Sequence, residues 1–234
     1  MSSHPHVLVA GASGKTGREI IRLLAPRPVT VRALTRSEAN TADLEARGAD
    51  EVLIGDLFDP ADAAAAVADA EVVLSAVGSD IRALREKRFV DGDGVRNLVS
   101  AAEDAGVRAF VMESALGVGD EPASAFGRVF NAVIGPIQRA KAESEAALRD
   151  AALGHTIIRP GLLTNGRRTD TVQVAPPGAK LWGRVSRADV ARLMAAAPWT
   201  PAATDRTFEV VDNPLLTRHP DLVAVDWVDG PRRS

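Results

Sequence analysis

The chain of 234 residues contains no cysteine and no tyrosine, and only 4% of its residues are aromatic. Without cysteine it can form no disulfide, no thiolate metal site and no cysteine nucleophile. Without tyrosine, no mechanism can use a phenol of this chain as its proton donor. The four histidines are scattered without metal-ligand spacing, so no metal site is expected: His4, His6, His155 and His219.

Strong charge and long apolar runs are also missing. The net charge of −3 provides no basic surface for nucleic acid or anionic lipid. No apolar run reaches transmembrane length, and the first apolar strand begins within six residues of Met1, which leaves no room for a signal peptide. An apolar content of 46% suits one globular domain over 1–234. We therefore expect a cytoplasmic protein, monomeric or homodimeric, that binds neither nucleic acid nor membrane.

The segment from His6 to Arg22 predicts a phosphate-binding element. The apolar run 7–10 is followed by three spaced glycines and an amphipathic stretch, which indicates a buried strand, a tight turn and a helix. Gly11 allows the sharp turn, Gly14 lets the backbone approach a pyrophosphate, and Gly17 lets the helix lie close to the sheet. Free N–H groups of the first helical turn then bind the anion. The predicted contacts are Gly11, Ser13, Gly14, Lys15, Thr16 and Gly17.

Two alternatives for this turn are a nucleoside-triphosphate P-loop and a glycine turn without a ligand. Gly14 and Lys15 resemble the end of a P-loop, but that motif needs another glycine five residues before the Gly-Lys pair. Val9 occupies that position inside the strand, so the loop is too short to wrap a β-phosphate. Three glycines spaced between a strand and a helix favour a dinucleotide over an empty turn.

The residue that follows the second predicted strand indicates which dinucleotide binds. Arg36 lies 19 residues after Gly17, where NAD-binding folds carry an Asp or Glu for the ribose 2′-hydroxyl. A guanidinium there can pair with a 2′-phosphate, whereas a carboxylate would repel it. We therefore expect NADP(H) rather than NAD(H), with Lys15 as a second contact. A solvated surface arginine is the alternative.

Strands and helices alternate with a repeat of about 30 residues, which is typical of a Rossmann-type, doubly wound, mostly parallel α/β sheet. The predicted strands after the first are 29–34, 51–55, 71–77, 107–112, 156–159 and 207–211, and the predicted helices after the first are 41–47, 60–69, 91–105, 136–152 and 187–197. Ligands of such sheets bind outside the carboxyl ends of the strands. Further predicted cofactor contacts at these ends are Asp56, Leu57, Ala76, Val77 and Gly78. Asp56 either accepts a hydrogen bond from the adenine amino group or caps its own loop.

Two less regular segments are candidates for covering a substrate. Segment 115–136 mixes glycine with apolar residues, and segment 162–186 is loop-like, with a possible short strand at 172–174. Together they would form a small C-terminal lobe, although an ordinary packed loop is the alternative for the first. Pro136 is expected to begin the helix that follows. A weak strand signal lies at 222–225.

The order of these motifs resembles the atypical or extended short-chain dehydrogenases, in particular the small NAD(P)H-binding branch with the flavin and biliverdin-IXβ reductases and the NmrA-like proteins. The matching positions are 11–17, Arg36, 55–56, 76–78, 94–98, 105–107, Ser114, 141–143 and 158–161. The resemblance implies that Ser114 bonds the nicotinamide or the substrate and that Lys141 binds the nicotinamide ribose. It also adds Pro160 and Gly161 to the cofactor site. The alternatives are a strand-end turn serine and a solvated helix lysine.

One position departs from the family pattern. The family carries its acid/base tyrosine four residues before the lysine, and here that position is Ile137. The usual alcohol–ketone chemistry is therefore not expected. The resemblance implies an NADPH-dependent reductase that transfers hydride to a small conjugated acceptor such as a flavin, quinone or linear tetrapyrrole, with the proton taken from water. A non-catalytic NADP(H) sensor is the alternative, and an epimerase or dehydratase ranks lower because it also lacks the tyrosine.

Overall fold

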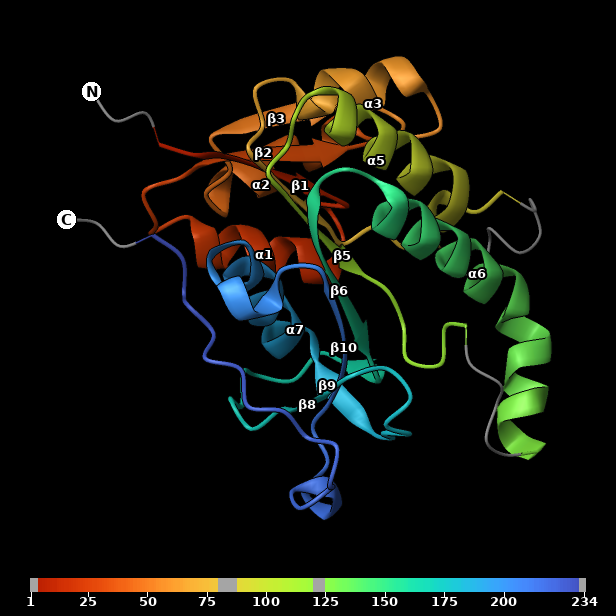
Figure 1. Cartoon of the computed structure of the whole chain (residues 1–234). Coiled ribbons are helices and arrows are strands. Elements are labelled where there is room, and N and C mark those ends of the chain that lie inside the picture. The colour runs from red at the N-terminus through yellow and green to blue at the C-terminus, as the bar shows by residue number, and fades with distance from the viewer. Residues whose placement is uncertain (1–3, 80–87, 120–124, 232–234) are drawn as a thin grey trace.

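The computed structural model describes residues 4–79, 88–119 and 125–231, which form a sheet between two layers of helices (Figure 1). The main sheet has eight strands in the order β3-β2-β1-β4-β5-β6-β10-β8. Its first seven strands are parallel, and β8 is antiparallel to β10 at the edge. These strands are β1 (His6–Ala10), β2 (Thr30–Thr35), β3 (Glu51–Ile54), β4 (Val72–Ser75), β5 (Ala109–Glu113), β6 (Gly154–Pro160), β8 (Gln173–Ala175) and β10 (Arg206–Val211). The predicted Rossmann-type fold is confirmed.

Helices cover both faces of the sheet. One face packs against α1 (Lys15–Leu24) and α7 (Arg187–Ala196), and the other against α3 (Pro60–Val67), α5 (Val95–Asp104) and α6 (Ala125–Asp150) (Figure 1). The short α2 (Thr41–Ala46) connects β2 to β3. Outside α6, the predicted strands and helices through 211 lie within two residues of those observed, except that the start of 91–105 is a π-helical turn, Val90–Gly94.

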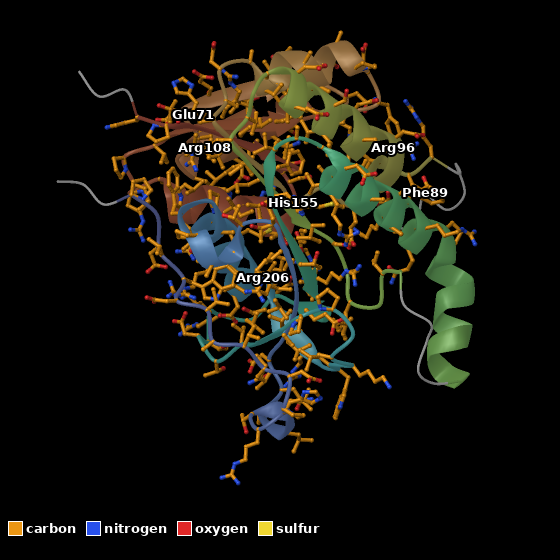
Figure 2. All side chains as sticks on the ribbon, viewed as in Figure 1. Glu71, Phe89, Arg96, Arg108, His155 and Arg206 are labelled. Atoms are coloured by element: carbon orange, nitrogen blue, oxygen red, sulfur yellow. The ribbon has the colours of Figure 1, made fainter. Side chains whose placement is uncertain are left out.

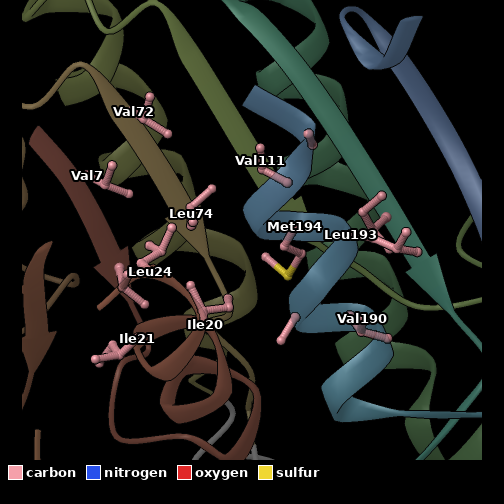
Figure 3. Packing of buried hydrophobic residues seen from close by; sticks show 14 of the residues in the cluster. Val7, Ile20, Ile21, Leu24, Val72, Leu74, Val111, Val190, Leu193 and Met194 are labelled. Carbon is pink, nitrogen blue, oxygen red and sulfur yellow. The ribbon is translucent and has the colours of Figure 1, made fainter. Parts of the chain in front are cut away.

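Alternation along β1 divides its side chains between two cores. Val7 and Val9 pack with Ile20 and Ile21 of α1, in the cluster that also receives α7 (Figure 3). Leu8 belongs to the cluster on the opposite face. Such burial stabilises the fold by about 1.5–3 kcal/mol for each large apolar side chain. A strand buried on both faces needs the continuous apolar run that the sequence shows.

The predicted start of the sixth helix at Pro136 is wrong. Helix α6 begins at Ala125 and contains Pro136 in its interior, so its first half occupies much of the segment expected to be an irregular cover. Proline removes one backbone hydrogen bond and crowds the preceding turn, but it does not forbid a helix on both sides. The helix changes direction along its length (Figure 1), as interior proline commonly causes. Part of the cover segment, 120–124, lies outside the described residues.

Segment 162–186 is more regular than expected. It contains β7 (Leu162–Thr164) and β9 (Arg184–Ser186), which pair in parallel as a separate two-stranded sheet, besides β8. The possible strand at 172–174 is thus confirmed with a shift of one residue. The strand signal at 222–225 is wrong: Val223 N donates one hydrogen bond to Val174 O, but no ladder forms there in the described chain.

Candidate functional site

The turn between β1 and α1 has the tight geometry that the glycine spacing predicts. Gly11 has a φ of +74°, and a Cβ built on it would lie 2.5 Å from the carbonyl oxygen of Ala76. A Cβ on Gly17 would lie 2.3 Å from the carbonyl oxygen of Gly11. Because these are backbone contacts, neither position can accept a side chain without moving the chain. The first turn of α1 is therefore held directly against the end of β1.

A cavity of about 230 Å³ opens at the carboxyl ends of β1, β2 and β4. It is lined by these residues of the predicted cofactor site: Gly11, Ser13, Gly14, Arg36, Leu57 and 76–78. The sequence did not identify four further wall residues, namely Leu34, Thr35, Gly55 and Val90. Thr35 and Gly55 directly precede the predicted contacts Arg36 and Asp56, and Leu34 precedes Thr35. Extending each predicted contact segment by one or two residues would therefore have found them. Val90 follows a segment without a recognisable pattern.

The start of α1 is open to an anion. Gly14 caps the helix without any side-chain hydrogen bond, and the first turn carries no acidic residue. The N–H groups there lack intrahelical partners, and the helix dipole favours negative charge at this end. Arg36 and Lys15 are exposed nearby, and neither has an ion-pair partner among the described residues. The turn thus supplies backbone donors, and two uncommitted cations lie near it.

Several predicted contacts lie away from the cavity wall. Asp56 Oδ1 accepts a hydrogen bond from the backbone N–H of Phe58 at 3.1 Å, which matches the loop-capping alternative. Pro160 and Gly161 end β6 instead: the Pro160 carbonyl accepts from Leu116 N, and Gly161 N donates to the carbonyl of Val210. Among the predicted turn residues, Lys15, Thr16 and Gly17 are not part of the wall either.

Ser114 is engaged by a buried carboxylate. Its Oγ donates a hydrogen bond to Oε1 of Glu145 at 2.5 Å, and Arg159 donates to both oxygens of the same carboxylate. Burial by itself raises the pKa of Glu145, but the hydrogen bonds from Arg159 and Ser114 outweigh it and hold the pKa below its usual value. An ionised carboxylate only accepts, so Ser114 has committed its one proton. Towards a ligand, its oxygen can act as an acceptor.

Lys141 is also paired inside the protein. Its Nζ lies 2.5 Å from Oδ1 of Asp91, which is fully buried, while Oδ2 of Asp91 accepts from the backbone N–H of Ser79 at 2.5 Å. Ser144 Oγ bonds the carbonyl oxygen of Asp91 and so ties the π-helical turn to α6. An ammonium has three donors, so this pairing orients Lys141 and still leaves donors for another group. On the nearby surface, Arg96 joins α5 to α6 (Figure 2).

Glu113 is the residue directly before Ser114, and it points to the opposite face of the sheet. Its side chain is buried, and Oε1 accepts a hydrogen bond from Thr16 Oγ1 of α1 at 3.2 Å. Burial raises the pKa of this carboxyl, against the opposing charge of Lys141. Sequence analysis did not single out Glu113, Asp91 or Glu145. Of these three, Glu113 could have been found from the sequence, because it is an acidic residue at the end of an apolar strand.

The whole arrangement matches a known family. The family model for NAD(P)H-binding proteins matches residues 11–201, which includes the turn, the cavity and the strand ends described above. The chain belongs to this NAD(P)H-binding family. Proteins similar to this chain carry different names. The chain is 32% identical over 209 residues to an uncharacterised sugar epimerase, YhfK of Bacillus subtilis, covering 88% of this chain and 94% of that protein.

Other proteins to which the chain is similar are described as reductases. An NAD(P)H azoreductase of Xenophilus azovorans is 27% identical over 157 residues, which cover 66% of this chain and 47% of that enzyme. The structure of ChuY, an anaerobilin reductase of Escherichia coli O157:H7, superposes with a TM-score of 0.74 and 26% identity, over 94% of this chain and all of that chain. The resemblance to the atypical short-chain dehydrogenases that the sequence motifs indicated is confirmed. The described helices include none long and apolar enough to cross a membrane.

Proposed function

We propose that this chain is an NADPH-dependent reductase that transfers hydride to a small conjugated acceptor. The observation that carries the proposal is the combination of an intact nucleotide turn with the replacement of the family's acid/base tyrosine by Ile137. Conjugated acceptors take a hydride without the alkoxide that alcohol–ketone chemistry must protonate through a tyrosine. Two similar proteins named as reductases, the azoreductase and ChuY, support the same class of reaction.

NADPH is the proposed form of the cofactor. Residues of the cavity wall fit its nucleotide half: the glycine turn and the α1 N-terminus would hold the pyrophosphate, and Arg36 would pair with the 2′-phosphate. When bound, the cofactor supplies the hydride. Ser114, with its proton committed to Glu145, would accept a hydrogen bond from the carboxamide of the nicotinamide or from an N–H of the acceptor. Lys141, oriented by Asp91, would donate to the ribose hydroxyls.

The test is the loss of NADPH absorbance with lumiflavin, menadione, biliverdin and an azo dye as separate acceptors. We expect turnover with at least one of them, and faster turnover with NADPH than with NADH. Gly17→Ala, which disrupts the turn that binds the pyrophosphate, is the matched variant that should abolish the signal. Absence of turnover with every acceptor, beside tight binding of NADPH by calorimetry, would refute the reductase proposal.

A second candidate is a non-catalytic NADP(H) sensor. It is favoured by the internal engagement of both family site residues, because Ser114 is bonded to Glu145 and Lys141 to Asp91. An epimerase ranks below both, since the missing tyrosine removes the group that would move its proton. The acceptor panel separates reductase from sensor, because only the reductase consumes NADPH.

A further inference from the structure

Three carboxyl groups are buried near the carboxyl ends of β4 and β5, and two of them are paired with cations. Asp91 is paired with Lys141, and Glu145 is paired with Arg159. The hydrogen bonds from Arg159 and Ser114 hold the pKa of Glu145 below its usual value, which makes Glu145 a poor source of a proton. Both oxygens of Asp91 are already engaged, one by Lys141 and the other by the backbone N–H of Ser79. The third group is Glu113, which is only 7% exposed.

Glu113 has a neutral partner instead. Within the described chain, its side-chain oxygens receive one hydrogen bond, from the hydroxyl of Thr16, and form no ion pair. A carboxyl removed from water without a bonded cation favours its neutral, protonated form. Glu113 therefore differs in kind from the two paired acids beside it. It is the buried acid at this edge that is suited to carry a proton.

Glu113 lies beside the cofactor cavity, although it is not one of the residues that line the cavity wall. The parallel register of β4 and β5 pairs Met112 with Ser75, so Glu113 is level with Ala76, which lines the cavity. On its other side Glu113 contacts Thr16, in the helical turn that begins at the pyrophosphate site. The carboxyl thus lies between the end of β4 and the start of α1, at the carboxyl edge where such sheets bind their ligands.

We propose that Glu113 is the proton donor that replaces the missing tyrosine. This inference rests on the proposed reductase function. The acceptor takes a hydride, with its two electrons, from NADPH and becomes an anion. The O–H bond of the Glu113 carboxylic acid then breaks, its proton forms a new N–H, O–H or C–H bond on that anion, and the Glu113 carboxylate is reprotonated from solvent. The sum is acceptor plus NADPH plus one proton giving reduced acceptor plus NADP⁺.

The charges that face Glu113 come from three other elements. Lys141 on α6 and Arg187 at the start of α7 lower the pKa of its carboxyl, and Asp91 in the π-helical turn raises it. Burial is the largest effect and makes the net shift upward. The carboxyl therefore keeps its proton to a higher pH than an exposed glutamate does, as general acids in enzymes must.

The experiment compares the wild-type chain with Glu113→Gln and with the control Glu143→Gln. Glutamine keeps the shape and can still accept from Thr16, but it cannot give up a proton. Glu143 is an exposed carboxyl on α6, paired with Arg96 at 2.7 Å. Infrared difference spectroscopy near neutral pH first asks whether a protonated carboxyl is present. The kcat over a range of pH, with whichever acceptor of the panel turns over fastest, and the Kd for NADPH are then measured for each protein.

We expect a carboxylic C=O band in the wild type and in Glu143→Gln, and its loss in Glu113→Gln. Glu113→Gln should lower kcat by about 100-fold or more, leave the Kd for NADPH within about threefold of wild type, and remove the fall of kcat at alkaline pH. An absent band, or a Glu113→Gln variant with wild-type kcat and pH profile, would overturn the proposal. A band without turnover in the wild type would instead refute the reductase function itself, and the transfer step with it. If Glu113→Gln does not fold, a wild-type kcat that stays constant as pH rises would still overturn it.

Discussion

The ammonium of Lys141 lies 2.5 Å from the carboxylate of Asp91, a fully buried side chain on the turn that precedes α5. This pair joins α6 to the segment that borders the cavity, because Asp91 also accepts from the backbone N–H of Ser79 just after Gly78. The lysine that the family resemblance assigns to the nicotinamide ribose is thus held in place before any ligand arrives. Its orientation depends on Asp91.

Asp91→Asn should destabilise the protein strongly. The substitution leaves the Lys141 ammonium, only 12% exposed, without its counter-ion, and breaking a buried pair costs about 3–5 kcal/mol. Urea unfolding measures the loss. Asp93→Asn, in the same turn but 66% exposed, should cost less than about 1 kcal/mol. Adding Lys141→Met should recover part of the unfolding free energy that Asp91→Asn loses. If the effects of the two substitutions on the unfolding free energy were simply additive, the coupling of Asp91 to Lys141 would be contradicted.

Arg36→Ala should weaken NADPH binding far more than NADH binding. The variant removes charged hydrogen bonds to the 2′-phosphate, worth about 1.5–3 kcal/mol, which NADH does not make. Isothermal calorimetry with each cofactor measures the difference. Arg22→Ala removes an exposed arginine of α1 that pairs with Glu19, and it should leave both affinities unchanged. Equal losses for NADPH and NADH in Arg36→Ala would refute the assignment of Arg36.

Gly17→Ala should both destabilise the fold and abolish cofactor binding. The added Cβ would lie 2.3 Å from the carbonyl oxygen of Gly11, and backbone must move to relieve that contact. Overpacking of this kind costs about 1–3 kcal/mol. Gly135→Ala is the matched control, because a Cβ there has no atom within 4 Å and its φ is not positive. Thermal melts with and without NADPH distinguish the two variants, and an NADPH-induced stabilisation that survives in Gly17→Ala would contradict the prediction.

Glu113→Gln should become relatively more stable as pH rises. A carboxyl whose pKa is raised by burial binds its proton more tightly in the folded state, so its contribution is complete below the unfolded pKa, about 4.3, and is lost as pH rises through the folded pKa. Glutamine cannot ionise and escapes that loss. The difference in Tm from wild type should therefore increase as pH rises above about 4.3, the unfolded pKa. A Tm difference that does not change with pH would show that the pKa of Glu113 is not raised in the folded protein.

The residues predicted to bind the nucleotide gather around one cavity, whereas the predicted catalytic residues Ser114 and Lys141 are bonded to internal carboxyls. Their roles stay predictions. Gly11, Gly14 and Arg36 line one cavity, as their spacing indicated. Close backbone approach requires glycine wherever it occurs, so a short segment carries that information locally. Pro136 shows the limit of local rules, since it suggested a helix start in a place where α6 continues through it.

Chain order and composition determined the alternating strands and helices, the glycine turn and the absence of a tyrosine, because each is a property of adjacent residues or of the residue inventory. Only the tertiary structure decided how the acids are used. Ser114 meets Glu145 from 31 residues away, and Thr16 meets Glu113 from 97 residues away. Whether a carboxyl keeps or loses its proton depends on burial and on neighbouring charges, and packing between distant elements sets both.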